Sequence, residues 1–357
     1  MQNKPVLNYF NSTQPMKKIS CLRCILLLLL FAAPVQFTYA QSGYKVIKKV
    51  NVPGDGRWDF ITFDSESRKV YLSHGTVMQV VDIDKETVIG EVKNTPGIHG
   101  IAIAREVGKG FTSNGKDSTV TVFDLTTLAT LKTIKIAGSN PDHIIYDSFS
   151  KNIFVFNNKS GDVSIIDPAQ LKVLKTVKLG GMPELAVSDG NGNIYLNLED
   201  KSELIKFDAK TYEVKARWPL APGEEPTGIA LDLKNKRLFT GCAKLLIVVN
   251  AETGKVITKL PIGDKVDGVA FDPVTMQIFT SNGEGTVTVI QQESADSYKV
   301  LENLPTTPGA KTIALDEAKH LVYIPVADLT IPPATTETPN PRSKVKPNTF
   351  GVLVIGK

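Results

Sequence analysis

Seven positions of the sequence, spaced roughly 40 residues apart, carry mostly acidic or imidazole side chains. Carboxylates and histidine ligate divalent cations, and they transfer protons in general acid and base catalysis. Most of the seven positions have these residue types, so together they could form one chemical site. The seven positions, called the ring residues below, are Asp59, His99, Asp142, Glu184, Thr227, Asp267 and Lys311.

Two interpretations of the ring residues stay open. In the functional one, a subset binds a single divalent metal ion, and Asp142, Glu184 and His99 serve as catalytic acids or bases. In the structural one, the same groups form a solvated rim with ordered water. Neighbouring carboxylates raise one another's pKa, so either arrangement needs a cation, a proton or the Lys311 ammonium as an offset. The predicted metal ligands are Asp59, His99, Asp142, Glu184 and Asp267.

A second group of residues is expected to surround the ring, because it follows second strands or lies in loops that reach the same face. Its members are polar, charged or aromatic. The Asn-Gly pairs at Asn114 and Asn282 also suit tight hairpin turns, which is the interpretation that we favour for the asparagines. The predicted ligand-contacting residues are Trp58, His74, Asn114, Asn157, Thr227, Glu224, Glu225, Asn282, Glu284 and Lys311.

The elements that must position these residues form an internal repeat. Each unit has an apolar strand that mostly ends in Asp, an aromatic-led strand, a β-branched strand and a strand rich in Lys and Val, as in 144–147 and 153–156. Seven such units predict an all-β fold, a seven-bladed β-propeller. The first strand of each blade lines the central channel, so the ring residues should surround one axial funnel. The Asp residues that recur at strand ends suit tight turns and are interpreted as scaffold.

The ends of the chain predict how the ring of blades closes. The last unit ends after its third strand, 350–355, and a spare strand, 44–52, precedes the first unit. We expect this spare strand to complete the last blade and to remove an exposed sheet edge. Residues 41–357 would then form a single domain, predicted to be a monomer.

The second strands resemble the aromatic-Val-x-Asn pattern that gives YVTN-repeat propellers their name. The pattern appears at 71–74, 111–114, 154–157 and 279–282 and is lost at 195–198, 239–242 and 323–326. The resemblance covers nearly all of 44–357 and points to the YncE-like exported bacterial propellers. That group includes nucleic-acid binders and lactonase relatives, so the resemblance implies a fold and not one activity.

One segment interrupts the repeat. Residues 327–349, called the insertion below, form a Pro/Thr-rich stretch between the second and third strands of the last blade. Long insertions in compact domains commonly serve as lids or binding loops, and the alternative is a surface extension without a role. The insertion is expected to emerge on the face that carries the ring residues.

The N-terminus has the pattern of a secretory signal. Lys17 and Lys18 precede the apolar run 25–33, and a small-residue cleavage site ends at Ala40. Translation could begin at Met1 or Met16. Cleavage after Ala40 predicts a periplasmic or secreted protein without a membrane anchor. The formal charge of +4 comes from basic residues of this leader, so the mature chain has no overall attraction for nucleic acid.

No sequence motif identifies a particular chemistry. The chain lacks a Gly-x-Gly-x-x-Gly motif before a helix and a Walker loop, so no nucleotide cofactor is expected. The first hypothesis is a metal-assisted hydrolase or lyase, lactonase-like by analogy. The second is a non-enzymatic module that binds a protein, a glycan or a small molecule on the funnel face. Single-stranded nucleic-acid binding comes third, because basic and aromatic residues are not interleaved.

Overall fold

The computed structural model describes residues 1–2, 11, 42–332, 341 and 343–357. The predicted signal sequence, including its apolar run and its cleavage site after Ala40, lies outside the described residues. So do residues 333–340 and 342 of the insertion. No helix in the described residues is both long and apolar enough to cross a membrane.

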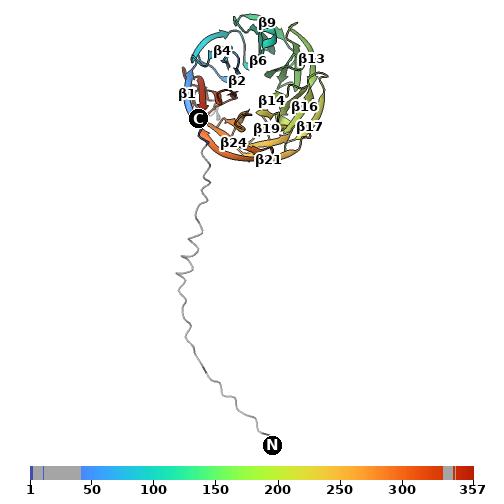
Figure 1. The fold of residues 1–357 in the computed structure, drawn as a ribbon, viewed down its shortest axis with the longest axis vertical. Coiled ribbons are helices and arrows are strands. Elements are labelled where there is room, and N and C mark those ends of the chain that lie inside the picture. Colours follow the sequence, from blue (N-terminus) through green and yellow to red (C-terminus); the bar gives the residue numbers. More distant parts are fainter. Residues whose placement is uncertain (3–10, 12–41, 333–340, 342) are drawn as a thin grey trace. The chain divides into compact units, whose positions relative to one another are not determined.

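Residues 42–357 form a seven-bladed β-propeller, as the repeat predicted (Figure 1). Blades 1 to 3 consist of β2 (Trp58–Asp64), β3 (Lys69–His74), β4 (Val77–Asp82), β5 (Thr87–Val92); β6 (Ile98–Ala104), β7 (Lys109–Asn114), β8 (Thr119–Asp124), β9 (Thr130–Lys135); and β10 (Pro141–Asp147), β11 (Asn152–Asn157), β12 (Asp162–Asp167), β13 (Lys172–Lys178). Blades 4 to 6 consist of β14 (Pro183–Ser188), β15 (Asn193–Leu198), β16 (Glu203–Asp208), β17 (Val214–Pro219); β18 (Ile229–Asp232), β19 (Arg237–Cys242), β20 (Leu245–Asn250), β21 (Val256–Pro261); and β22 (Val266–Asp272), β23 (Gln277–Asn282), β24 (Thr286–Ser294), β25 (Ser297–Pro305).

The seventh blade joins the two ends of the propeller. It has the strand order β1 (Lys45–Asn51), β30 (Gly351–Gly356), β27 (Leu321–Val326) and β26 (Ala314–Asp316). The N-terminal strand β1 pairs antiparallel with β30, with Val50 opposite Val352. This pairing confirms the predicted closure of the ring by the N-terminal strand.

Burial explains why the aromatic-led strands repeat. All residues of the aromatic-led strands β19 and β23 are buried, because both faces of these strands pack against neighbouring blades. The fourth strands lie at the rim, where their outer edges could pair with other chains. Most of them carry lysine, as in β13, and charged side chains on an edge strand oppose such pairing.

The Asp residues that end first strands form contacts between blades as well as turns. Asp147 accepts a hydrogen bond from the backbone N–H of Ser150 at 2.7 Å within its own turn. Asp272 accepts backbone N–H groups in its turn, and its Oδ2 lies 2.7 Å from Nδ1 of His320 in the next blade. Asp316 likewise forms an ion pair with Arg68 of blade 1 at 2.6 Å. These contacts agree with the structural interpretation of the Asp set and add a link from blade to blade.

Candidate functional site

Irregular strand pairing places the ring residues at the funnel. The register of β2 against β3 shifts between Trp58 and Ile61, which leaves Asp59 outside the regular ladder. The same shift occurs around His99, Asp142, Glu184 and Asp267 in their own blades. A bulge bends the strand and changes the direction of a side chain, and bulges are common next to functional sites.

Serines of the second strands hold three of these irregular segments. Ser73 Oγ accepts the backbone N–H groups of Asp59 and Phe60. Ser113 Oγ accepts the N–H of Gly100 at 2.8 Å and donates to the backbone oxygen of Asp142 in the next blade. Ser281 occupies the equivalent place in blade 6, where its partners are the N–H of Gly268 and the backbone oxygen of Lys311. This role was not predicted from the sequence, although the serine recurs in the aromatic-led strands.

Three of the ring residues form a contact cluster, called the triad below. Nδ1 of His99 lies 2.5 Å from Oδ2 of Asp59 and 3.6 Å from Oδ1 of Asp142. One ligand atom from each residue lies within 4.8 Å of the other two. The side chains are 20%, 28% and 17% exposed for Asp59, His99 and Asp142, so solvent reaches all three.

Lys311 connects the triad to a fourth ring residue. Its Nζ lies 3.7 Å from Oδ1 of Asp59 and 3.2 Å from Oδ2 of Asp267. The carboxylate of Asp267, opposed by burial and aided by Asp59, raises the pKa of Lys311, so this ammonium stays charged. Asp59 therefore interacts with His99 through one oxygen and with Lys311 through the other.

The remaining carboxylates of the ring tend to retain protons. Burial, with the charges of nearby ring carboxylates, raises the pKa of Asp142 to about 7, although His99 opposes the shift. Burial and the charge of Asp142 raise the pKa of Glu184 to about 9. Burial alone would lower the pKa of His99, but its hydrogen bond to Asp59 and the charge of Asp142 raise it. The ring thus has more acid groups than Lys311 and His99 can neutralise.

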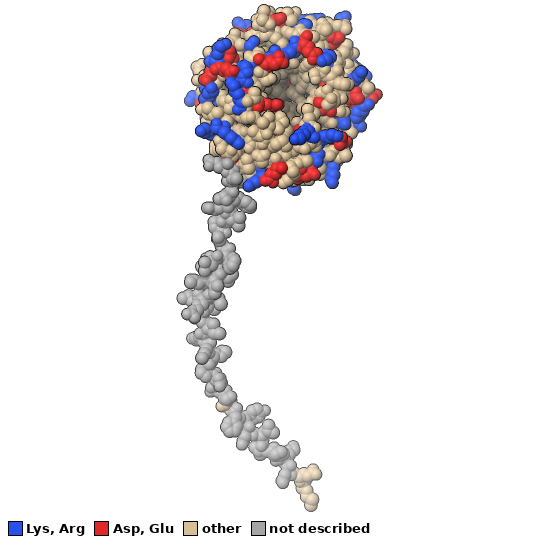
Figure 2. Space-filling model, viewed as in Figure 1, with Lys and Arg blue, Asp and Glu red and all other residues tan. Residues whose placement is uncertain are grey.

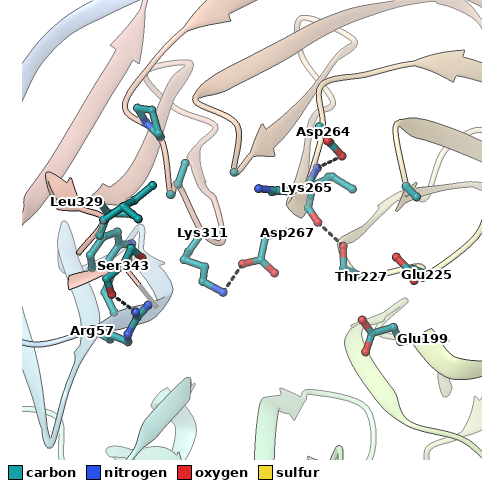
Figure 3. Close-up of a pocket in the computed structure, with 18 residues that line it drawn as sticks. Arg57, Glu199, Glu225, Thr227, Asp264, Lys265, Asp267, Lys311, Leu329 and Ser343 are labelled. Atoms are coloured by element: carbon teal, nitrogen blue, oxygen red, sulfur yellow. Dashed lines mark hydrogen bonds and ion pairs between the residues drawn. The ribbon is translucent and has the colours of Figure 1, made fainter. Parts of the chain in front are cut away.

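A cavity of about 690 Å³ opens beside the triad. Thr227, Asp267 and Lys311 contribute to its wall, and Figure 3 shows the Lys311 ammonium directed at the Asp267 carboxylate. The triad residues themselves do not line it. Figure 2 shows the hollow at the centre of the disc.

The insertion contributes to the same cavity, as its expected position implied. Leu329 and Ser343 line the wall opposite Thr227 (Figure 3), and Ile331 also lines the cavity. Within the insertion, β28 (Leu329–Thr330) pairs with β29 (Lys344–Val345). The guanidinium of Arg57 donates to the backbone oxygen of Ser343, which ties the insertion to blade 1.

The predicted ligand-contacting residues divide into three groups. Trp58, Thr227, Glu225 and Lys311 line the cavity. Glu224 and Glu284 are exposed but do not line it, and Glu284 accepts a hydrogen bond from Thr286. The third group, which is His74, Asn114, Asn157 and Asn282, is buried inside the blades.

The buried asparagines tie second strands to third strands. Nδ2 of Asn114 donates to Thr119 and Thr121, and Nδ2 of Asn282 donates to Thr286 and Thr288. Asn157 does the same with Asp162 and Ser164 in blade 3. The His74 side chain also has a hydrogen-bond partner within its blade, since its Nδ1 lies 2.8 Å from Oε1 of Gln79. These contacts favour a structural role for all four residues.

Two residues close to the site are not reactive. His143 stacks between Phe60 and Phe156, and its Nδ1 accepts the backbone N–H of Ala186. Burial lowers the pKa of His143 to about 3, so its imidazole is neutral at neutral pH. Burial likewise raises the pKa of the Cys242 thiol to about 12, so a thiolate nucleophile does not form at neutral pH.

Asn158 is a residue of the site that the sequence analysis missed. Its Nδ2 donates to Oε1 of Glu184 at 2.7 Å. No motif marks it, because it follows the second strand of blade 3 by one residue and contacts the next blade. The neutral amide gives Glu184 a hydrogen bond without offsetting its charge.

The comparisons with known proteins agree on the fold and give no activity. Residues 71–220 match the family described as a domain of unknown function, DUF5074. No curated protein sequence matches the chain. Among solved structures, hydrazine synthase of Kuenenia stuttgartiensis is similar with 16% identity and a TM-score of 0.68, covering 83% of this chain and 97% of that one. The structure of U3-55K has 8% identity and a TM-score of 0.72, covering 89% and 100%.

Proposed function

We propose that the funnel face is a metal-assisted hydrolase or lyase site for a small molecule held in the 690 Å³ cavity. The observation that carries this proposal is the triad, in which one imidazole nitrogen and two carboxylate oxygens converge within 4.8 Å. Mixed nitrogen and oxygen donors suit Zn²⁺ and related divalent ions. The surplus of acid groups in the ring also favours a bound cation.

The triad and the residues next to it would have different roles in the reaction. A metal ion held by Asp59, His99 and Asp142 would supply Lewis-acid polarisation of a carbonyl or activation of a water. Lys311 lies at the boundary between triad and cavity, so its ammonium can stabilise a developing oxyanion. Glu184, whose pKa is raised to about 9, holds a proton at neutral pH and can act as a general acid.

Elemental mass spectrometry of the purified protein tests the metal site. We expect about one equivalent of one divalent metal, and its loss in Asp142→Asn. Glu284→Gln is the matched control, because Glu284 is an exposed acid outside the triad and the cavity. A screen of ester, lactone and amide substrates then tests turnover. Absence of metal from both proteins after soaking with divalent cations would overturn the proposal.

A non-enzymatic binding function is the second candidate. It is favoured by the separation of the two features, since the cavity wall contains none of the triad residues. A binding protein would capture its ligand equally well with and without the triad, and it would show no turnover. Capture of a small molecule by Asp142→Asn with unchanged affinity would favour this candidate.

Export to the periplasm or the exterior is part of the proposal and rests on the sequence of the leader. The mature protein should begin at Gln41. Sequencing of the N-terminus after expression in an exporting host tests this expectation. A mature chain that retains Met1 or Met16 would contradict it.

A further inference from the structure

The cavity beside the triad is lined by both acidic and basic side chains. Asp264, Lys265 and Asp267 are among them, and Asp267 forms an ion pair with Lys311. Glu199 and Glu225 lie on one side, and Arg57 and Lys311 lie on the other (Figure 3). Neither glutamate has an ion-pair partner among the residues that the structure describes. Within that part of the chain, the Arg57 guanidinium donates one hydrogen bond, to the backbone oxygen of Ser343.

The two glutamates are close enough to affect each other. Burial raises the pKa of Glu199, and the charge of Glu225 raises it further. An ammonium group placed between them would therefore relieve repulsion as well as form new ion pairs. On the other wall, the Arg57 guanidinium retains donors that could bind a carboxylate in a bidentate manner.

We propose that this cavity binds a zwitterion of tripeptide size, with its amine at Glu199 and Glu225 and its carboxylate at Arg57. The cavity volume of about 690 Å³ falls within the range of about 300–1,000 Å³ that is usual for small-molecule sites. A tripeptide spans about 10 Å when extended, so its free amine and its free carboxylate lie at opposite ends of the molecule. Leu329 and Ile331 of the insertion add apolar surface to the cavity.

This inference rests on the proposed function only in naming the class of small molecule that the funnel receives. The charged walls do not include the triad, so ligand binding and metal binding can be measured separately. The substrate class would be a short peptide or an amino-acid derivative with both ends free.

Isothermal titration with three matched probes tests the proposal. Trialanine carries both charges, N-acetyl-trialanine carries only the carboxylate, and trialanine amide carries only the amine. We expect trialanine to bind about tenfold more tightly than either derivative, because each derivative leaves one charged wall unpaired. Equal affinity for all three probes would overturn the proposal.

Variants assign each end of the probe to its wall. The double substitution Glu199→Gln with Glu225→Gln should abolish the preference for trialanine over its N-acetyl form and keep the preference over the amide. Arg57→Gln should do the reverse. Glu284→Gln should change neither preference, and thermal unfolding of each variant checks that it is folded. Preferences that do not follow this pattern would contradict the assignment.

The state of the metal site separates this proposal from the previous one. Trialanine binding to protein treated with EDTA supports the zwitterion site whether or not a metal is ever found. Binding that requires added Zn²⁺ supports both proposals. Failure of trialanine to bind to protein with and without Zn²⁺ overturns the zwitterion site and leaves the metal site standing.

Discussion

Oδ2 of Asp59 lies 2.5 Å from Nδ1 of His99, although the two residues belong to different blades. The pair places an acid and a base of the triad in direct contact, and its position depends on the packing of blade 1 against blade 2. In the absence of metal, a proton shared by these two atoms would occupy the place that the metal is proposed to take. Metal and proton should therefore compete.

Asp59→Asn tests this competition. We expect the metal affinity to fall at least roughly tenfold, since a neutral amide replaces a charged oxygen ligand. Competition with a chromophoric chelator measures the affinity, and wild-type protein should bind metal more weakly as the pH falls. Glu284→Gln serves as the control. An Asp59→Asn protein with wild-type affinity would remove Asp59 from the metal site.

Ser113→Ala tests how the triad is positioned. The substitution removes the hydrogen bonds of Oγ to the N–H of Gly100 and to the backbone oxygen of Asp142, at a cost of about 1–2 kcal/mol in the free energy of unfolding. Because Asp142 is a predicted ligand, metal binding should weaken as well. Ser281→Ala loses equivalent bonds in blade 6 and should cost similar stability without the same loss of metal. Equal metal binding by the two variants would argue against positioning by Ser113.

Glu184→Gln tests the excess of acid groups in the ring. The raised pKa of Glu184, about 9, means that folding takes up a proton at neutral pH, so this group destabilises the fold increasingly as the pH rises from its ordinary pKa towards 9. Glutamine removes that cost and can keep the hydrogen bond from Asn158. We expect the variant to melt roughly 2–4 °C higher than wild type at pH 8 and to differ less at pH 5. A lower melting temperature at pH 8 would contradict the assignment.

The fold could be predicted from the sequence because each blade repeats the same burial pattern. The aromatic-led strands, such as β23, are buried along their whole length, and this shows as recurring apolar residues. Closure by β1 was also predictable, since one strand was missing at one end of the chain and one was spare at the other. Repetition thus supplied the comparison that a single sequence otherwise lacks.

The site was less predictable, because its contacts join different blades. Asp59, His99 and Asp142 come from three separate repeats, and their distances depend on how bulges turn each side chain. Asn114 and Asn282 appear polar in sequence, but their partners are threonines on the adjacent strand. The position of a residue in the repeat predicts which face of the propeller it lies on. It does not predict which residue its side chain contacts.

Asp272→Ala tests the contacts between blades on the turns opposite the funnel. Burial alone would raise the pKa of Asp272, but hydrogen bonds from Val274, Thr275 and His320 lower it. A lowered pKa stabilises the fold above the ordinary pKa of aspartate, and this stabilisation is lost as the pH falls. We expect Asp272→Ala to reduce the free energy of unfolding by about 2–4 kcal/mol at pH 7 and to leave metal binding unchanged.

The pH dependence distinguishes this contact from general loss of packing. The difference in stability between wild type and Asp272→Ala should shrink as the pH falls below 4, which is opposite in sign to the trend for Glu184. Denaturant unfolding at several pH values measures it. Glu317→Gln, an exposed acid in the next blade, is the control and should unfold like wild type. A pH-independent difference would indicate that packing alone is lost.

Val50→Asp tests closure of the ring by β1. Val50 is 3% exposed and lies opposite Val352, so a charged side chain there should separate β1 from β30. Ile47 is on the same strand but 45% exposed, which makes Ile47→Asp the matched control. Burial of an unpaired carboxylate should cost about 3 kcal/mol or more in Val50→Asp and little in the control. Chemical denaturation gives both values.

Deletion of residues 44–52 extends the same argument. Without β1, the strand β30 becomes an open edge, and Tyr44 no longer packs against Phe279 of blade 6. Open edges pair with other chains, so the deletion variant should aggregate during size-exclusion chromatography. The synthetic peptide 44–52 added during refolding should restore some monomer, because it can supply the missing strand. A soluble, folded monomer without the peptide would show that six complete blades and a three-stranded seventh are sufficient.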